Sequence, residues 1–200
     1  MRLQDLFSGW SRKKEQKYEL VRDQSITVDD RPLYRIRALK DFGDVKAGDV
    51  GGYVESEDNL WQVGSCWVGD EARVFDKAWV GGDAHVYDRA MVCGNALVTD
   101  RAHVFGNARV MGKARVGGNA RVYGDARVSN NASVTDNALV GGEAWVRGEA
   151  QVSGSAMVGG RAQVCGSAQI GGEAAVRGDE IIVNSYQVCS LPPVLRTFHR

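Results

Sequence analysis

A six-residue alternation of small, branched and turn-forming residues runs through most of the chain. Alanine occupies all 18 positions that fall every six residues from Ala72 to Ala174. Valine, with a single isoleucine, occupies the 19 positions that fall every six residues from Val68 to Val176. Two residues after each valine, from position 76 to position 178, the chain carries Gly at 13 of 18 positions and Asp or Asn at the others. The repeating unit is therefore Ala-x-Val-x-Gly-x, with no insertion.

This period fits short strands and excludes an α-helix. A helix turns by about 100° per residue, so valines six residues apart would spiral around it instead of sharing a face. In a strand, Ala and Val two positions apart point to the same side. Gly, Asp and Asn tolerate the left-handed backbone of a sharp corner. Strands this short must stack on one another to bury anything, so we predict a parallel β-helix over residues 61–183.

The flanking regions predict caps for the two open ends of this array. Residues 1–17 are expected as a short helix or a disordered arm. Apolar and polar residues then alternate as in strands, with a turn at Asp29–Pro32. We assign residues 1–60 to this arm and a small β cap, because an open β-helix end exposes apolar core and unpaired strand edges. Residues 184–200 are expected to be a C-terminal tail or cap.

Charge and composition exclude several classes of function. Lys and Arg number 25, as do Asp and Glu, so we expect no sequence-specific nucleic acid as a partner. No apolar run approaches the roughly 20 residues that span a bilayer. The N-terminal segment lacks the apolar stretch of a signal peptide, so we predict a cytoplasmic protein without a membrane partner. The four cysteines show no CxxC spacing and no nearby histidine pair, so no metal site is predicted.

One stretch before the repeats carries a more specific pattern. It contains Asp41-Phe42, Asp44-Val45-Lys46-Ala47-Gly48, Gly51-Gly52-Tyr53-Val54, Asn59 and Gly64-Ser65-Cys66-Trp67. This pattern resembles the corresponding segment of YdcK-like hexapeptide-repeat proteins, bacterial proteins loosely labelled as transferases. The resemblance implies a left-handed, triangular β-helix with three hexapeptides per coil, and hence about six coils here. It also implies a phage or prophage origin, since similar short chains are common among such genes.

Residues 18 apart should lie one above another on successive coils, and two such rows carry candidate chemistry. The rows are His85, His103 and Arg121, and Tyr87, Phe105 and Tyr123. One interpretation is a groove where the rings stack a flat ligand and Arg121 pairs with an anion. The other, which we favour, is the interface of a homotrimer, where aromatic and arginine side chains are frequent anchors. Both can hold, because grooves between subunits are typical ligand sites.

Other outward positions carry apolar residues and arginines. The apolar set is Trp79, Leu97, Leu139, Trp145 and Met157. So many apolar side chains are unusual on a free surface and argue for self-association. The arginines at positions 109, 115, 121 and 127 occupy consecutive outward positions. They are either solvated side chains, perhaps paired with Asp125 or Glu143, or a basic ring for an anionic ligand.

Two functions remain open from the sequence. We favour a non-catalytic scaffold or binding protein, a homotrimer that holds a protein partner or a small anionic or nucleotide ligand and needs no cofactor. The alternative, implied by the resemblance to hexapeptide-repeat enzymes, is an acyltransferase or acetyltransferase that uses acetyl-CoA, with His85 or His103 as general base. Such enzymes often carry a loop that interrupts the repeat, and the unbroken period here favours the binding protein.

Overall fold

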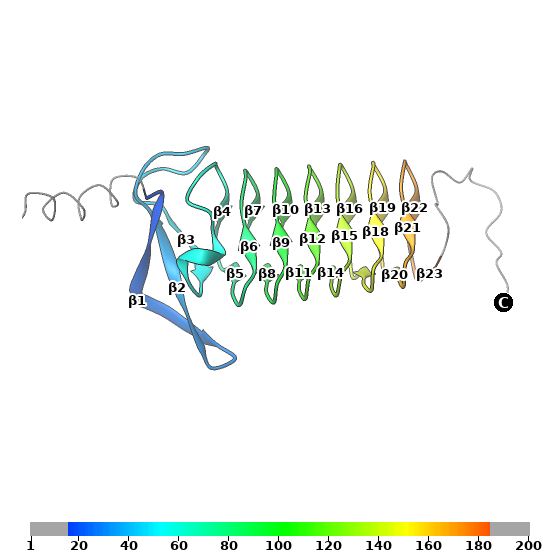
Figure 1. The fold of residues 1–200 in the computed structure, drawn as a ribbon, viewed down its shortest axis with the longest axis horizontal. Helices are drawn as coiled ribbons and strands as arrows, with labels where there is room; N and C mark the ends of the chain where they lie inside the picture. The colour runs from blue at the N-terminus through cyan, green and yellow to red at the C-terminus, as the bar shows by residue number, and fades with distance from the viewer. Residues whose placement is uncertain (1–15, 185–200) are drawn as a thin grey trace, which may run out of the picture.

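The six-residue repeat folds into a parallel β-solenoid of about seven turns in the computed structural model, which describes residues 16–184. The turns stack along one axis, with an antiparallel hairpin at their N-terminal end (Figure 1). Within the described part, the only helical turn is a 3-10 helix, η1 (Glu57–Asn59). The prediction of an all-β parallel β-helix is confirmed. The predicted arm at residues 1–17 and tail at residues 184–200 fall almost wholly outside the described residues.

Each turn adds one short strand to each of three sheets. The ten-stranded sheet contains β1 (Tyr18–Val28), β2 (Arg31–Ala38), β3 (Val50–Val54), β5 (Arg73–Val74), β8 (Met91–Val92), β11 (Arg109–Val110), β14 (Arg127–Val128), β17 (Trp145–Val146), β20 (Gln163–Cys165) and β23 (Ile181–Val183). The seven-stranded sheet contains β4 (Trp67–Val68), β7 (His85–Val86), β10 (His103–Val104), β13 (Arg121–Val122), β16 (Leu139–Val140), β19 (Met157–Val158) and β22 (Ala175–Val176). The six-stranded sheet contains β6 (Trp79–Val80), β9 (Leu97–Val98), β12 (Arg115–Val116), β15 (Ser133–Val134), β18 (Gln151–Val152) and β21 (Gln169–Ile170). Because β4 precedes Ala72, the solenoid begins before the first complete repeat.

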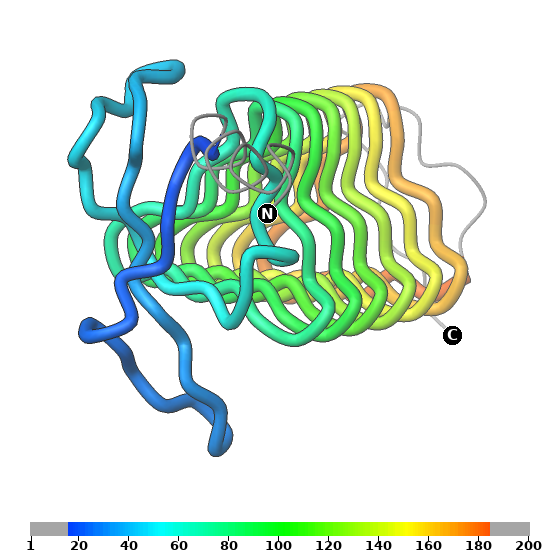
Figure 2. The backbone as a smooth tube through the Cα atoms, turned by 60° about the vertical axis from the view of Figure 1, so that its left-hand side comes forward, coloured from blue at the N-terminus to red at the C-terminus, as the bar shows by residue number. Residues whose placement is uncertain are grey.

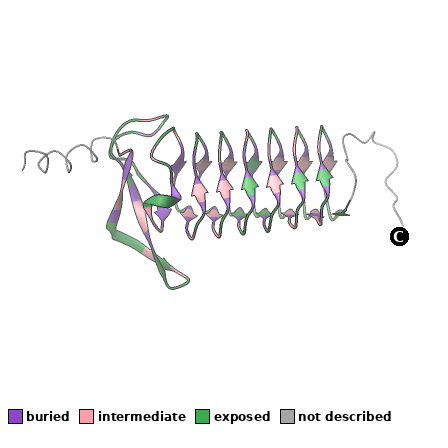
Figure 3. Ribbon diagram, in the orientation of Figure 1, coloured by how far each residue is buried: buried purple, intermediate pink, exposed green. Residues whose placement is uncertain are grey.

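The alanine and valine columns form the interior. Every Ala from 72 to 174 and every Val or Ile from 68 to 176 in the repeat is at most 2% exposed. Strands pair so that valine faces valine on successive turns, as Val86, Val104 and Val122 do. Burial of one valine contributes roughly 1.5–3 kcal/mol, and this column continues through every turn. The residue between Ala and Val points outward and is at least partly exposed in most repeats (Figure 3).

The corners between strands adopt the left-handed backbone that the sequence predicts. All 18 corner residues from Asp76 to Gly178 have φ between 58° and 76°. The aspartates at these corners also reach the next turn. The Asp100 carboxylate accepts a hydrogen bond of 2.8 Å from the amide of Gly118, 18 residues on, and Asp136 accepts one of 2.9 Å from Gly154. A corner aspartate therefore adds a side-chain hydrogen bond between two turns, which a corner glycine cannot provide.

The N-terminal hairpin extends the ten-stranded sheet beyond the solenoid (Figures 1 and 2). β1 pairs with β2 in antiparallel register, with an irregularity between Val21 and Ser25, and the turn contains Asp29 and Asp30 at positive φ. The residues between Tyr18 and Val28 therefore form one long strand. No helix within residues 16–184 is long and apolar enough to span a membrane.

Buried polar groups connect the start of the hairpin to the first turn of the solenoid by hydrogen bonds. The single hydroxyl proton of Tyr18 is shared between the carbonyl oxygens of Leu60, at 2.8 Å, and Glu57, at 3.1 Å. The ammonium of Lys17 lies 2.8 Å from the carbonyl oxygen and 3.1 Å from Sγ of Cys66, and both residues are at most 1% exposed. Burial lowers the pKa of Lys17, while the Cys66 side chain opposes that shift. This end of the apolar column is thus covered by the chain itself.

Candidate functional site

The predicted histidine row forms on the outer face of the seven-stranded sheet. His85 pairs in register with His103, and His103 pairs with Arg121. The two imidazole rings stack with centroids 5.5 Å apart and planes 14° from parallel. β7, β10 and β13 place these side chains there because the outward position of each repeat recurs after one turn of 18 residues.

The predicted aromatic row also forms, at the corner that follows each of these strands. The rings of Tyr87 and Phe105 stack 5.0 Å apart, and those of Phe105 and Tyr123 stack 5.4 Å apart. We call these three residues the aromatic ladder. At the next turn Gly141 makes room for the Tyr123 ring, since an added Cβ would lie 2.3 Å from that ring. The rings of Tyr87 and His103 lie nearly perpendicular, with centroids 6.1 Å apart, so the ladder and the histidine row form one surface.

Partial burial lowers the pKa of both histidines. Desolvation lowers the pKa of His85, against the opposing charges of Asp44 and Asp83. Desolvation also lowers the pKa of His103, and the charges of His85 and Arg121 lower it further. Both imidazoles are therefore neutral near pH 7, as a general base must be. Neither has a hydrogen-bond partner among the described residues, so no carboxylate orients them as in a catalytic triad.

The arginine row spreads over all three sheets, as expected from its spacing. Arg109 and Arg127 are neighbours on the ten-stranded sheet, while Arg115 lies on the six-stranded sheet and Arg121 on the seven-stranded sheet. The suggested pairing with Asp125 or Glu143 is wrong within residues 16–184, because the ion pairs there join other residues. Asp125 instead accepts a hydrogen bond of 3.0 Å from the Asn107 amide.

The outward apolar residues are distributed over all three sheets. Leu139 and Met157 continue the row of Arg121 on the seven-stranded sheet. Trp79 and Leu97 are neighbours on the six-stranded sheet. Trp145 lies on the ten-stranded sheet, where the Arg147 guanidinium covers its ring at 4.0 Å. The seven-stranded sheet therefore combines the histidine row, the aromatic ladder and an apolar continuation.

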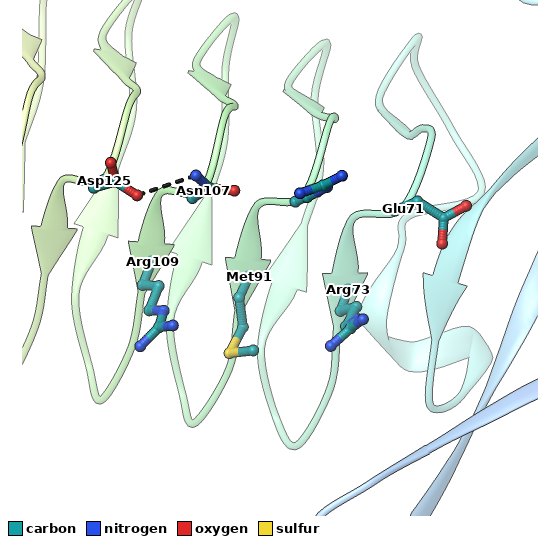
Figure 4. A pocket seen from close by; sticks show the side chains of 7 residues that line it. Glu71, Arg73, Met91, Asn107, Arg109 and Asp125 are labelled. Atoms are coloured by element: carbon teal, nitrogen blue, oxygen red, sulfur yellow. Dashed lines mark hydrogen bonds between the residues drawn. The ribbon is translucent and has the colours of Figure 1, made fainter.

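A second feature, which the sequence analysis missed, lies on the other side of the same corner. A groove of about 440 Å³ follows the ten-stranded sheet between two rows of side chains (Figure 4). One row contains Glu71, Arg89, Asn107 and Asp125, and the other contains Arg73, Met91 and Arg109. The 18-residue spacing that revealed the histidine row would also have aligned these residues. Within residues 16–184, no group of three or more His, Cys, Asp or Glu side chains is placed to hold a metal ion.

Comparison with known protein families finds a match to a repeat in the middle of the solenoid. Residues 114–130 and 120–135 match the model of the YdcK beta solenoid repeat. These residues lie in the middle of the solenoid, between β12 and β15. No curated protein matches the chain. This part of the solenoid is therefore similar to the YdcK beta solenoid repeat.

Proposed function

We propose that this protein is a non-catalytic binding protein that works as a homotrimer, with the seven-stranded sheet and the aromatic ladder as its contact surface. The observation that carries the proposal is the composition of that sheet's outward row. Its members in chain order are Trp67, His85, His103, Arg121, Leu139, Met157 and Ala175. Arg121 is the one permanently charged side chain in the row, and the ladder flanks it.

The other two sheets are more polar on the outside. The outward row of the ten-stranded sheet includes Arg73, Arg109 and Arg127. The six-stranded row ends in Ser133, Gln151 and Gln169. Contiguous apolar patches and aromatic anchors mark surfaces that contact another protein. The apolar row and the ladder therefore favour self-association through the seven-stranded sheet.

The molar mass in solution tests the trimer. Light scattering of the full chain is expected to give three times 21.7 kDa. A charge at Leu139, as in Leu139→Lys, is expected to yield monomers, because the half-buried leucine lies in the middle of the contact row. Gln151→Lys is the matched control, since Gln151 has the same outward position on the six-stranded sheet. A monomeric wild type, or equal dissociation of both variants, would contradict the proposed interface.

We also propose that the grooves between subunits hold a small anionic ligand, such as a nucleotide, or a protein partner. Stacked rings offer a flat face to an aromatic base, and Arg121 offers a bidentate partner for phosphate. The support is the geometry of the ladder beside Arg121. A native mass spectrum of freshly purified protein is expected to show the trimer with any ligand that co-purifies. A trimer that carries no added mass and gains none from added nucleotide would count against a nucleotide ligand.

An acyltransferase is the second candidate, favoured by one observation. The lowered pKa values of His85 and His103 leave neutral imidazoles on the surface, which can accept a proton. If this function is correct, calorimetry detects acetyl-CoA binding and His103→Ala abolishes acetyl transfer. Absence of acetyl-CoA binding removes this candidate without affecting the binding-protein proposal.

The handedness of the coils, the domain bounds, the origin and the cellular location are also proposals. We propose left-handed, triangular coils, supported by the three corners in each 18-residue turn. We also keep the division into residues 1–60, 61–183 and 184–200, and a phage or prophage origin on the basis of the resemblance. A cytoplasmic location is supported by the free thiols of Cys66, Cys93 and Cys165. A crystal structure with right-handed coils would contradict the first of these points.

A further inference from the structure

We propose that the groove on the ten-stranded sheet is a binding site for the phosphate group of a small organic molecule. Its walls carry three guanidinium groups, those of Arg73, Arg89 and Arg109. The site lies across the corner from the aromatic ladder, and it does not depend on the proposed trimer.

The three arginines have no anionic partner in the described part of the chain, although Glu71 and Asp125 also line the groove. Glu71 is paired with Arg35, which reaches over from the hairpin, and Asp125 accepts a hydrogen bond from Asn107. Both acids that line the groove are thus already engaged. No ion pair or side-chain hydrogen bond joins Arg73, Arg89 or Arg109 to another residue between positions 16 and 184. The groove therefore offers unpaired donors to an anion.

Arg73 provides an independent indication of a missing acceptor. Its Nε atom is buried and has no hydrogen-bond partner within residues 16–184. A buried donor without a partner is costly, and most buried polar groups in proteins are paired. Arg73 lies on β5, next to β3 in the ten-stranded sheet, and it is half-buried, whereas Arg89 and Arg109 are exposed. Arg73 is one of the residues that line the groove, so this unpaired donor belongs to a side chain in its wall.

The spacing of the side chains favours phosphate over a single carboxylate. Neighbouring strands are about 4.8 Å apart, so Arg73 and Arg109 start about 10 Å apart on one wall, with Met91 between them. Arg89 approaches from the opposite wall. A phosphate dianion has three strong acceptor oxygens and carries about −1.5 to −2 charge near pH 7. It can receive bonds from several guanidinium groups, while Met91 contacts the organic part of the ligand.

Titration with inorganic phosphate tests this site on the full chain. Calorimetry at low ionic strength is expected to show one saturable site per chain. Arg109→Gln and Arg89→Gln are each expected to weaken binding at least tenfold, because each removes a charge-assisted hydrogen bond. Acetate, titrated in parallel, is expected to bind at least tenfold more weakly than phosphate.

Two matched controls separate a site from general positive charge. Arg127→Gln removes the next arginine of the same row, one turn beyond the groove. Arg101→Gln removes an arginine from the same repeat position as Arg89, at a different corner. Both are expected to change the affinity less than twofold, with unchanged melting temperatures in all variants. No saturable phosphate binding by the wild type, or equal losses in Arg109→Gln and Arg127→Gln, would overturn the proposal.

Discussion

At the scale of single residues, the corners show how one position meets two demands. The backbone must be left-handed there, and the next turn lies directly above. A Cβ at Gly118 would lie 2.7 Å from the backbone nitrogen of Asp136, and one at Gly142 would lie 2.8 Å from the carbonyl oxygen of Gly160. Glycine relieves both constraints at once. Aspartate adapts to the same place and gains a hydrogen bond to the next corner, as Asp100 does.

The steric part of this demand can be measured with one pair of variants. Gly118 and Gly178 share φ of +66°, but an added Cβ at Gly178 would have none of residues 16–184 within 4 Å beyond its chain neighbours. Both Ala variants are expected to lose about 1–2 kcal/mol of stability for the left-handed conformation. Gly118→Ala should lose a further 1–3 kcal/mol or so for overpacking. Urea unfolding that shows equal losses at the two positions would contradict the steric argument.

The histidine row predicts a dependence of stability on pH. Because the folded-state pKa values of His85 and His103 are lowered, the unfolded chain binds more protons than the folded chain as the pH falls below 6.5. The melting temperature is therefore expected to fall between pH 7 and pH 5.5. The double variant His85→Gln, His103→Gln should show a flatter profile over this range. A wild-type profile as flat as that of the double variant would argue against desolvation of the rings.

At the scale of elements, the strands of the solenoid and the strands of the hairpin have different sources of stability. A two-residue strand such as β10 makes almost all of its contacts with the turns before and after it. The hairpin strands are long, and they connect to the solenoid through β3 and through buried polar groups. Tyr18 is fully buried and its hydroxyl holds two carbonyl oxygens of the segment around η1.

Removal of that hydroxyl is expected to weaken the cap. Tyr18→Phe should lower the free energy of unfolding by about 1–2 kcal/mol, because the buried carbonyl oxygen of Leu60 and the partly buried one of Glu57 lose their donor. Tyr34→Phe is the matched control, as Tyr34 is half-buried on β2 and its hydroxyl makes no hydrogen bond among the described residues. Denaturant melts of the two variants give the comparison. Similar values for both would mean that the cap does not depend on these bonds.

At the scale of the whole molecule, the solenoid is a stack in which each turn is stabilised only by its neighbours. Val122 lies in the middle of this stack, with turns on both sides, and is fully buried. Val176 lies in the last strand of the same sheet and pairs on one side, with Val158. The same substitution should therefore have different effects at the two places.

Truncation of these two valines tests the stacking model. Val122→Ala is expected to cost about 2–3 kcal/mol, through lost burial and the cavity that remains. Val176→Ala is expected to cost about half of that or less, because within the described residues its strand pairs with a neighbouring turn on one side only. Equilibrium unfolding of both variants supplies the values. A larger loss at Val176 would show that the terminal turn supports the rest of the stack.

Most of the fold could be predicted because its code is local and periodic. The alanines, valines and corner residues recur every six positions, so the core and the corners follow from counting. The same counting placed His85 above His103 and aligned the aromatic ladder. The groove could not be predicted because its charge depends on contacts between residues far apart in sequence. Arg35 pairs with Glu71, 36 positions later, so Glu71 is not paired with the arginines of the groove. The register irregularity of β1 between Val21 and Ser25 could not be seen in the alternation of its residues either.

The unbroken period has a consequence for how such a chain can change in length. Gain or loss of six residues within the array would preserve alanine and valine columns but rotate everything downstream onto the next sheet. Leu139 and Met157 would then no longer continue the row of Arg121. Gain or loss of 18 residues would preserve both columns and rows. The pattern of the core thus repeats every six residues, while the rows on the surface repeat every 18. Changes by six residues would preserve the core, but only changes by whole turns would also keep the surface rows aligned.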